Sequence, residues 1–387
     1  MKNRTVPFFK PSFTTEEEEA VCRVLRSGWL TTAKEALDFE KEFADFVGAK
    51  HALAVNSATS GLLLSMHAAG ITAGTKILTS PYTFISTATT ALHLGGGIVY
   101  ADIEPDSYNI SPEQIEEKLK RDPQIKAIVP IHIAGNVCNM REINRLAKQY
   151  GVAVIEDAAH SFPSKTAQGY AGTLGTLGVF SFYATKTITT GEGGMVCTND
   201  DALAKRISVL RSHGINRTIW DRYTDSKASW VYDVSDLGWK CNLPDILAAI
   251  GRVQLRKAES FFQKRKAIAE QFNKAFSQYD FLQTPPDGDG NAWHLYLLRL
   301  VPEKISVTRE AFAQALQEKG LGISVHFIPH FEFTYIKEQL GVQAKDFPQA
   351  AAKYANTITL PFWPDMSDED IAYVIDTVIQ TGKEFAR

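Results

Sequence analysis

The residues of this chain that are best suited to chemistry stand between positions 181 and 194. Lys186 follows the apolar, strand-like run Val179–Tyr183 and precedes the glycine-rich stretch Gly191-Glu192-Gly193-Gly194. Lysine normally stays on a solvated face, because an unpaired ammonium is costly to bury. At the rim of a sheet, in a partly desolvated pocket, its pKa falls, and the neutral amine can form a Schiff base with a carbonyl.

A carboxylate and an imidazole follow a second apolar strand pattern upstream. Residues 152–155 are all apolar, Asp157 comes directly after Glu156, and His160 follows shortly. A carboxylate at the end of a buried strand, together with a Schiff-base lysine, is what pyridoxal phosphate requires of a protein. Alone, each residue has an ordinary interpretation, a solvated lysine or a helix cap. Their combination and order favour a cofactor site.

Two further segments supply possible contacts to such a cofactor. Asn56–Gly61 lies between a predicted strand and a predicted helix and is rich in small hydroxylated residues. Free backbone N–H groups at a helix N-terminus bind anions, so this segment is a candidate phosphate site, with an ordinary helix cap as the alternative. Phe84 follows another strand, where it can stack on a flat heterocycle or pack in the core.

Composition excludes several classes of protein. The chain has 387 residues, a net charge of −3 and ordinary hydrophobic content, which disfavour nucleic-acid binding. No segment is long and apolar enough for a signal peptide or a membrane span. Its four cysteines are scattered, which predicts neither a disulfide framework nor a zinc site. We expect a soluble cytoplasmic protein with no metal.

Strand and helix patterns alternate over the first two thirds of the chain, which predicts an α/β fold with a mostly parallel sheet between helices. The patterns include strands at His51–Val55, Ile125–Ile133 and Ile323–Phe327, a helix at Met140–Tyr150 and a long helix at Gln254–Phe276. Ligands bind at the carboxyl ends of the strands in such sheets. We expect a large domain over residues 1–253 and a small α+β domain over residues 254–387.

The motifs together resemble the DegT/DnrJ/EryC1/StrS family of nucleotide-sugar aminotransferases, over essentially the whole chain. The motifs that carry the resemblance are Ser27-Gly28-Trp29-Leu30-Thr31-Thr32, Asn56-Ser57-Ala58-Thr59-Ser60-Gly61, Pro81-Tyr82-Thr83-Phe84, Glu156-Asp157-Ala158-Ala159-His160, Phe180 to Lys186, and Gly238 to Asp245. The pattern is similar to the branch that forms UDP-4-amino-4-deoxy-L-arabinose. The resemblance implies the PLP-dependent transferase fold type I, a homodimer with active sites shared between subunits, and pyridoxal phosphate as the cofactor.

The resemblance also implies a role for each motif residue. Lys186 holds pyridoxal phosphate as a Schiff base, Asp157 bonds the pyridine nitrogen, and His160 lies near the ring. Phe84 stacks on the ring face away from the lysine. The residues that hold the phosphate are Thr59, Ser60 and Ser181, joined by Lys240 or Asn242 of another subunit.

Some positions depart from the common family pattern. Lys240 and Asn242 stand where many members have asparagine and arginine, although a lysine also serves a phosphate well. Ala33 stands where a glycine is common. His326 and His330 have a metal-like spacing, but Pro329 disfavours a helix between them, so we expect them to line a substrate pocket.

The predicted activity is transfer of an amino group from L-glutamate, giving 2-oxoglutarate, to a nucleotide-linked keto-sugar, with C4 preferred over C3, for amino-sugar or surface-glycan synthesis. Two alternatives share the scaffold. Related sugar dehydratases carry histidine where this chain has Lys186, and a catalytically silent regulator is expected to lose Lys186 or Asp157. The nucleotide, the sugar and its stereochemistry are left open by the sequence.

Overall fold

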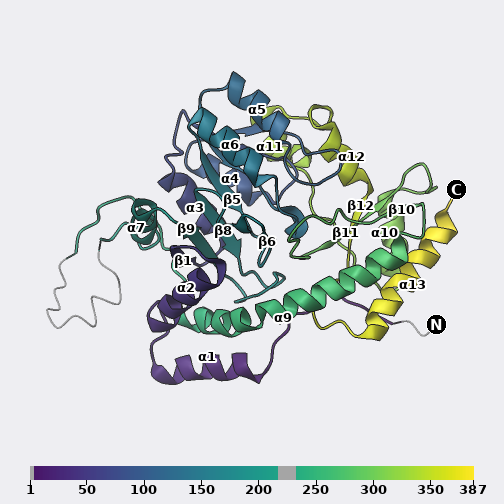
Figure 1. Cartoon of the computed structure of the whole chain (residues 1–387), viewed down its shortest axis with the longest axis horizontal. Coiled ribbons are helices and arrows are strands. Elements are labelled where there is room, and N and C mark those ends of the chain that lie inside the picture. Colours follow the sequence, from purple (N-terminus) through teal and green to yellow (C-terminus); the bar gives the residue numbers. More distant parts are fainter. Residues whose placement is uncertain (1–3, 217–231) are drawn as a thin grey trace.

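Two β-sheets of different size organise the chain (Figure 1). The structure is a computed structural model that describes residues 4–216 and 232–387. From one edge to the other, the seven strands of the larger sheet are β1 (His51–Val55), β9 (Gly194–Thr198), β8 (Leu177–Ser181), β5 (Ala153–Asp157), β4 (Ile125–Val129), β2 (Lys76–Thr79) and β3 (Gly97–Tyr100). Strand β9 is antiparallel to both neighbours, and the other pairs are parallel. The predicted mostly parallel sheet is confirmed.

Helices cover both faces of this sheet, because its strands are apolar on both sides. In β1, Leu53 and Val55 pack into one hydrophobic cluster, and Ala52 and Ala54 into another. The helices on the first face are α3 (Ala58–Ala68), α4 (Ser86–His93) and α7 (Asp201–Leu210). Those on the second face are α2 (Lys34–Val47), α5 (Pro112–Arg121), α6 (Met140–Tyr150) and the first half of α9 (Asp245–Phe276). Helix α1 (Thr15–Ser27) lies along α9.

The smaller sheet lies beside the second half of α9 (Figure 1). Its three antiparallel strands are β10 (Leu282–Gln283), β11 (Tyr296–Leu300) and β12 (Thr357–Leu360). The later helices are α10 (Arg309–Glu318), α11 (Thr334–Leu340), α12 (Pro348–Asn356) and α13 (Asp368–Phe385). The hairpin β6 (Lys165–Thr166) and β7 (Gly169–Tyr170) and three short 3-10 turns (133–135, 330–332 and 344–346) complete the described elements.

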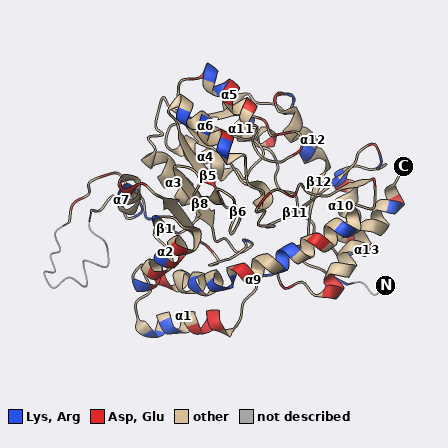
Figure 2. Cartoon of the chain, viewed as in Figure 1, with Lys and Arg blue, Asp and Glu red and all other residues tan. Residues whose placement is uncertain are grey.

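Charged side chains gather on the outer helices, whereas the central strands are mostly uncharged (Figure 2). Near the start of α1, the side chain of Thr14 accepts a hydrogen bond from the backbone N–H of Glu16, and the carboxylate of Glu17 accepts one from the backbone N–H of Thr14. This capping box fixes the start of the helix. Among the described residues, no helix is both long and apolar enough to cross a membrane.

Several predicted elements have different bounds in the structure. Helix α9 begins at Asp245 rather than Gln254, and the expected strand Ile125–Ile133 ends at Val129, before Pro130. Proline has no N–H with which to continue the strand ladder. The expected strand Ile323–Phe327 is reduced to one bridge between Ser324 and Thr359. Strand β12, which carries Thr359, takes its place beside β11.

The predicted domain division between residues 253 and 254 falls inside α9. This helix runs from the large sheet to the small one (Figure 1). Its residues Ala248 and Leu255 pack in a core of the large sheet, whereas Phe272 and Phe276 pack in the core of the small sheet. The division of the chain into two domains stays a prediction.

Candidate active site

The topology brings the predicted site residues to one edge of the large sheet. Strand β9 reverses direction, so that β1 and β8, on either side of it, both end at the edge where β9 begins. Val55, Gly194 and Ser181 lie side by side in this register. Strand β5 is parallel to β8, so Asp157 reaches the same edge. This is the edge at which α/β sheets bind ligands.

A cavity of about 390 Å³ opens at this edge. It is lined by most of the predicted site residues, which come from four separate segments of the chain. These residues are Thr59, Phe84, Asp157, His160, Ser181 and Lys186. Ser57, Gly193, His294, His326 and Phe327 line the same cavity.

Lys186 lies in the connection between β8 and β9. Its backbone N–H donates to the carbonyl of Tyr183 at 2.9 Å, which turns the chain back over the sheet edge. Its Nζ makes no hydrogen bond or ion pair with residues 4–216 or 232–387. Burial lowers the pKa of Lys186 to about 8, although the nearby carboxylate of Asp157 partly opposes this shift. Near neutral pH, an appreciable fraction of this amine is therefore uncharged and nucleophilic.

Asp157 is only 4% exposed, at the end of β5. Its Oδ2 accepts a hydrogen bond from Thr87 Oγ1 at 2.8 Å, and its Oδ1 accepts one from the backbone N–H of Ala159 at 3.2 Å. Burial raises the pKa of the Asp157 carboxyl, while these bonds and the charge of Lys186 act in the opposite direction. The carboxylate is thus fixed in orientation and suited to pair with a buried cationic ring nitrogen.

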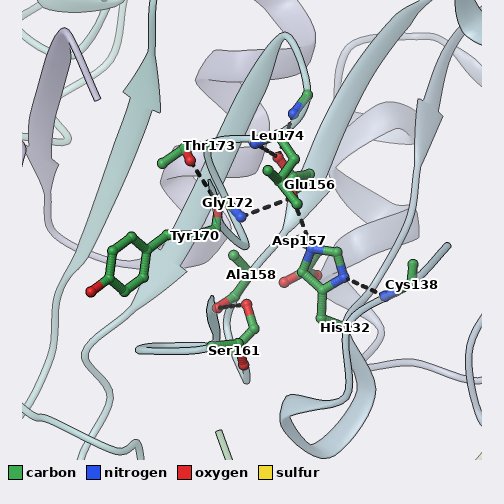
Figure 3. Close-up of polar contacts among 12 residues, drawn as sticks. His132, Cys138, Glu156, Asp157, Ala158, Ser161, Tyr170, Gly172, Thr173 and Leu174 are labelled. Carbon is green, nitrogen blue, oxygen red and sulfur yellow. Dashed lines mark hydrogen bonds and ion pairs between the residues drawn. The ribbon is translucent and has the colours of Figure 1, made fainter. Parts of the chain in front are cut away.

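The neighbouring carboxylate, Glu156, stabilises the scaffold (Figure 3). It is fully buried and accepts four hydrogen bonds. Its Oε1 accepts from the backbone N–H groups of Leu174 and Gly175 at 2.7 and 2.6 Å. Its Oε2 accepts from the N–H of Gly172 at 2.8 Å and lies 2.9 Å from His132 Nε2. His132 Nδ1 accepts the N–H of Cys138 at 3.1 Å, so the His132 proton is on Nε2.

His160 is buried against a second histidine that the sequence motifs did not indicate. Its Nδ1 accepts the backbone N–H of Ala134 at 3.3 Å, and its ring stacks on Phe327. The ring of His294 lies 4.5 Å from that of His160, centroid to centroid. Burial is the main cause that holds the pKa of both histidines well below the usual range, so both rings are neutral.

His294 lies two residues before β11, and the fold of the chain brings it to the cavity. Its backbone N–H donates to the carbonyl of Ala134 at 2.9 Å, in the same turn that holds His160. Its Nδ1 is buried and has no hydrogen-bond partner among the described residues. The only signal in the sequence is a histidine at the start of an apolar strand pattern, which does not identify a ligand contact.

The first turn of α3 forms the part of the cavity suited to a phosphate. Ser57 caps the helix by accepting the N–H of Ser60 at 3.1 Å, and Thr59 lines the cavity. A side chain at Gly194 would lie 2.8 Å from the backbone N of Ala58, so glycine allows β9 to approach this turn. Free N–H groups and a positive helix end favour an anion here.

Ser60, Lys240 and Asn242 lie outside the described lining of the cavity. The hydroxyl of Ser60 donates to Asn56 Oδ1 at 2.7 Å. Lys240 is exposed and donates to the side chain of Asn242, which in turn donates to the hydroxyl of Thr32. The roles of these residues toward the phosphate stay predictions.

Phe84 lies at the rim of the cavity, 57% exposed, with its ring 6.2 Å from that of Phe327. His326 lines the cavity, and its Nδ1 lies 3.0 Å from Thr359 Oγ1. His330 is directed instead to Tyr100, with Nδ1 2.8 Å from the hydroxyl oxygen. No cluster of three or more His, Cys, Asp or Glu side chains in the described residues is arranged to hold a metal.

Comparison with known proteins identifies the class. The sequence profile of the DegT/DnrJ/EryC1/StrS aminotransferase family matches residues 11–379, so the chain belongs to this family. It is 43% identical over 380 residues to the spore coat polysaccharide biosynthesis protein SpsC of Bacillus subtilis, covering 97% of each chain. It is 40% identical over 375 residues to the uncharacterized protein MJ1066 of Methanocaldococcus jannaschii, covering 96% of each.

Solved structures show the same fold. PseC of Helicobacter pylori, an aminotransferase involved in the biosynthesis of pseudoaminic acid, has a TM-score of 0.91 at 28% identity and covers 99% of this chain and 100% of its own. The PLP-form of the sugar aminotransferase Spr1654 of Streptococcus pneumoniae has a TM-score of 0.90 at 26% identity, covering 98% and 99%. This chain is therefore an aminotransferase that uses pyridoxal phosphate.

The cavity fits this cofactor by its own geometry. Lys186 offers an unpaired amine, and Asp157 a buried, oriented carboxylate. The contact between Gly194 and Ala58 keeps the first turn of α3 within the same cavity. The amine of Lys186 suits the aldehyde of the cofactor, the carboxylate of Asp157 suits its ring nitrogen, and the first turn of α3 suits its phosphate.

The lowered pKa of Lys186 can be measured in the cofactor-free protein. We expect acetylation of Lys186 by acetic anhydride to rise with pH through a midpoint of about 8, since only the neutral amine reacts. A free lysine derivative, Nα-acetyl-lysine amide, added to the same sample should follow a midpoint of about 10.4. Peptide mass mapping reports each site separately. Asp157→Asn should lower the Lys186 midpoint, because the carboxylate favours the ammonium. A Lys186 midpoint equal to that of the free lysine derivative would contradict the desolvated site.

The Glu156 network predicts a large stability cost for a nearly isosteric change. In Glu156→Gln, whichever oxygen the amide NH₂ replaces now faces two hydrogen-bond donors. We expect a loss of about 2–4 kcal/mol in the free energy of unfolding, measured by urea denaturation of the cofactor-free protein. The matched control is Glu142→Gln on the surface of α6, which should leave the midpoint nearly unchanged. Equal midpoints for the two variants would show that the network contributes little.

Proposed function

We propose that this protein transfers the amino group of L-glutamate to a nucleotide-linked keto-sugar, at C4, in the synthesis of an amino sugar for a surface polysaccharide. The observation that carries the proposal is the single cavity that holds both Lys186, with its pKa lowered to about 8, and the buried carboxylate of Asp157. An exposed lysine without this environment would remain protonated and could not act as a base at neutral pH.

The residues of the cavity divide the work of transamination. Pyridoxal phosphate, when bound, supplies a ring that withdraws electrons from the carbon bearing the amino group. Lys186 Nζ would hold the cofactor and, as a neutral amine, would accept the proton from that carbon and deliver it to the cofactor carbon that receives the amino group. Asp157 keeps a positive charge on the ring nitrogen, and Thr87 fixes the Asp157 carboxylate for this role. Phe84 covers the open side of the cavity.

The substrate class is supported by the relatives. SpsC is named for spore coat polysaccharide biosynthesis, and PseC is described as an aminotransferase involved in the biosynthesis of pseudoaminic acid. Both descriptions concern surface or acidic sugars, which is consistent with a sugar ketone as the acceptor here. The glutamate donor, the nucleotide link and a cytoplasmic location stay predictions from the sequence.

The activity is tested in two separate half-reactions. The holoenzyme with L-glutamate alone should release 2-oxoglutarate once per site, in a burst measured with glutamate dehydrogenase and NADH. Continuous release should then require a UDP-, dTDP- or GDP-linked 4-keto-sugar, with the aminated product identified by mass spectrometry. Release with the 3-keto isomers only would contradict C4. A burst with no turnover on any sugar would contradict the sugar acceptor.

Two substitutions test the assignment of the site. Lys186→Ala should abolish the burst, and Asp157→Asn should slow it by roughly 100-fold or more, because a neutral amide does not stabilise a protonated ring nitrogen. The matched control is Asp376→Asn, an exposed position on α13, which should retain the wild-type rate. A near-wild-type burst in Asp157→Asn would make this carboxylate a structural cap.

We also propose a homodimer in which Lys240 reaches the phosphate held in the partner subunit. Lys240 is exposed, and its segment runs beside the end of β1. There the N–H of Asn56 donates to the carbonyl of Cys241 at 2.8 Å. Lys240 thus lies near the turn proposed to bind the phosphate, but outside the described lining of the cavity of its own chain. Apolar side chains near the same end of the molecule stay largely exposed, as an interface requires. They include Leu25, Leu30 and Leu37, which are 45–52% exposed.

Mixing of inactive variants tests the shared site. Lys186→Ala and Lys240→Ala chains should each have little activity alone. If Lys240 acts across the interface, a mixed dimer has one site with both lesions and one with neither, so mixing should restore activity toward half the wild-type value per mixed dimer. Native mass spectrometry of tagged chains measures subunit exchange. Exchange without recovery would place Lys240 in the site of its own chain or in none.

A further inference from the structure

A second cavity, of about 150 Å³, lies where a loop that follows a strand of the large sheet meets the smaller sheet. It is separate from the active site and shares no lining residue with it. One side comes from the segment Asp106–Tyr108, which follows β3, and the other from β10, β11 and α12. Its lining includes Asp106, Tyr108, Gln283, Pro286, Arg299 and Lys353.

Lys353 is a buried cation in this cavity. The residue is 4% exposed, and its ammonium makes no hydrogen bond or ion pair with residues 4–216 or 232–387. Its Nζ lies 5.1 Å from the centre of the Tyr108 ring, which offers partial compensation through a cation–π contact. Burial lowers the pKa of Lys353, and the charge of Arg299 lowers it further. A partly desolvated ammonium with no paired carboxylate is costly to retain.

Arg299 adds a second positive charge to the same lining. It lies on β11 and donates from Nη1 to Gln283 Oε1 at 3.0 Å. Its Nε is buried and has no hydrogen-bond partner in the described part of the chain. A guanidinium with unused donors beside a second cation is electrostatically unfavourable unless an anion is present.

The only carboxylate among the described lining residues is Asp106, which is exposed. It raises the pKa of Lys353 through space, but this is the weakest of the three influences on that group. None of the ion pairs between described residues joins Asp106 to Lys353 or Arg299. The lining therefore carries one more positive charge than negative.

We propose that this cavity is a binding site for a small oxyanion, a phosphate or carboxylate group held between the Lys353 ammonium and the Arg299 guanidinium. The arginine matches either group with paired donors, and the lysine acts as a point charge. The bound anion satisfies the buried Nε of Arg299 and neutralises the excess charge. Because the two walls belong to distant segments of the chain, the anion also joins the Asp106–Tyr108 segment to the smaller sheet.

The test uses the holoenzyme, in which pyridoxal phosphate fills the phosphate site of the active-site cavity. Isothermal titration with sodium phosphate, and separately with sodium malonate, is carried out at constant ionic strength. Thermal unfolding is followed under the same conditions. We expect saturable binding of one anion per chain and a higher midpoint temperature, since a ligand of the folded state stabilises it. Tighter binding of phosphate identifies a phosphate group, and tighter binding of malonate a carboxylate.

Two variants and one control connect the binding to this cavity. Lys353→Met and Arg299→Gln should each weaken binding at least tenfold, and neither should change the glutamate burst. The control is Lys345→Met, an exposed lysine close in sequence to α12, which should bind as the wild type does. If Lys353→Met does not fold, Arg299→Gln alone tests the site.

Equal anion binding in wild type and in the folded variants, or no saturable binding at all, would overturn the proposal. In that case Lys353 and Arg299 are retained for packing on Tyr108 and Gln283. The result is independent of the proposed activity, because the glutamate burst reports only the active-site cavity.

Discussion

The active site depends on two adjacent carboxylates at the end of β5, Glu156 and Asp157. Successive residues of a strand point to opposite sides, so Glu156 and Asp157 face different surroundings. Glu156 is saturated by four donors and holds the 172–175 turn and His132 in place. Asp157 lines the cavity with Lys186. Glu156 therefore stabilises the scaffold of the site, whereas Asp157 is available to a ligand in the cavity.

The antiparallel direction of β9 brings Lys186 close to Asp157. A parallel sheet alone would place the connection after β8 on a crossover helix, far from the sheet edge. Because β9 returns antiparallel, the short connection 182–193 stays above the edge and holds Lys186 over Asp157. The close packing of Gly194 on Ala58 then allows the first turn of α3 to reach the same cavity. Amine, carboxylate and helix end converge because of one strand direction.

The parts of the fold with strong local signals could be predicted from the sequence. The strand His51–Val55 and the helix Met140–Tyr150 have the expected bounds, since apolar periodicity and capping residues determine them locally. The start of α9 could not be predicted in this way, because Gly251 weakens the helix pattern. In the structure a side chain there would lie 2.7 Å from Phe39, so the glycine serves close packing of α9 on α2. That requirement is visible only once the helices are placed.

Local sequence signals also explain why the motifs indicated Lys186 and Asp157 but missed His294. Lys186 and Asp157 follow apolar strands, so their position alone predicts the sheet edge. His294 belongs to the segment before β11, and it reaches His160 only because the 133–135 turn binds its backbone. Arg299, on β11 itself, is brought to Lys353 and Tyr108 by contacts between segments that are equally distant in the sequence. The segment before β11 thus contributes His294 to the active-site cavity, and β11 contributes Arg299 to the cationic cavity. The smaller sheet and the segment that leads into it therefore line both cavities, and helix α9 packs against both sheets and holds them together.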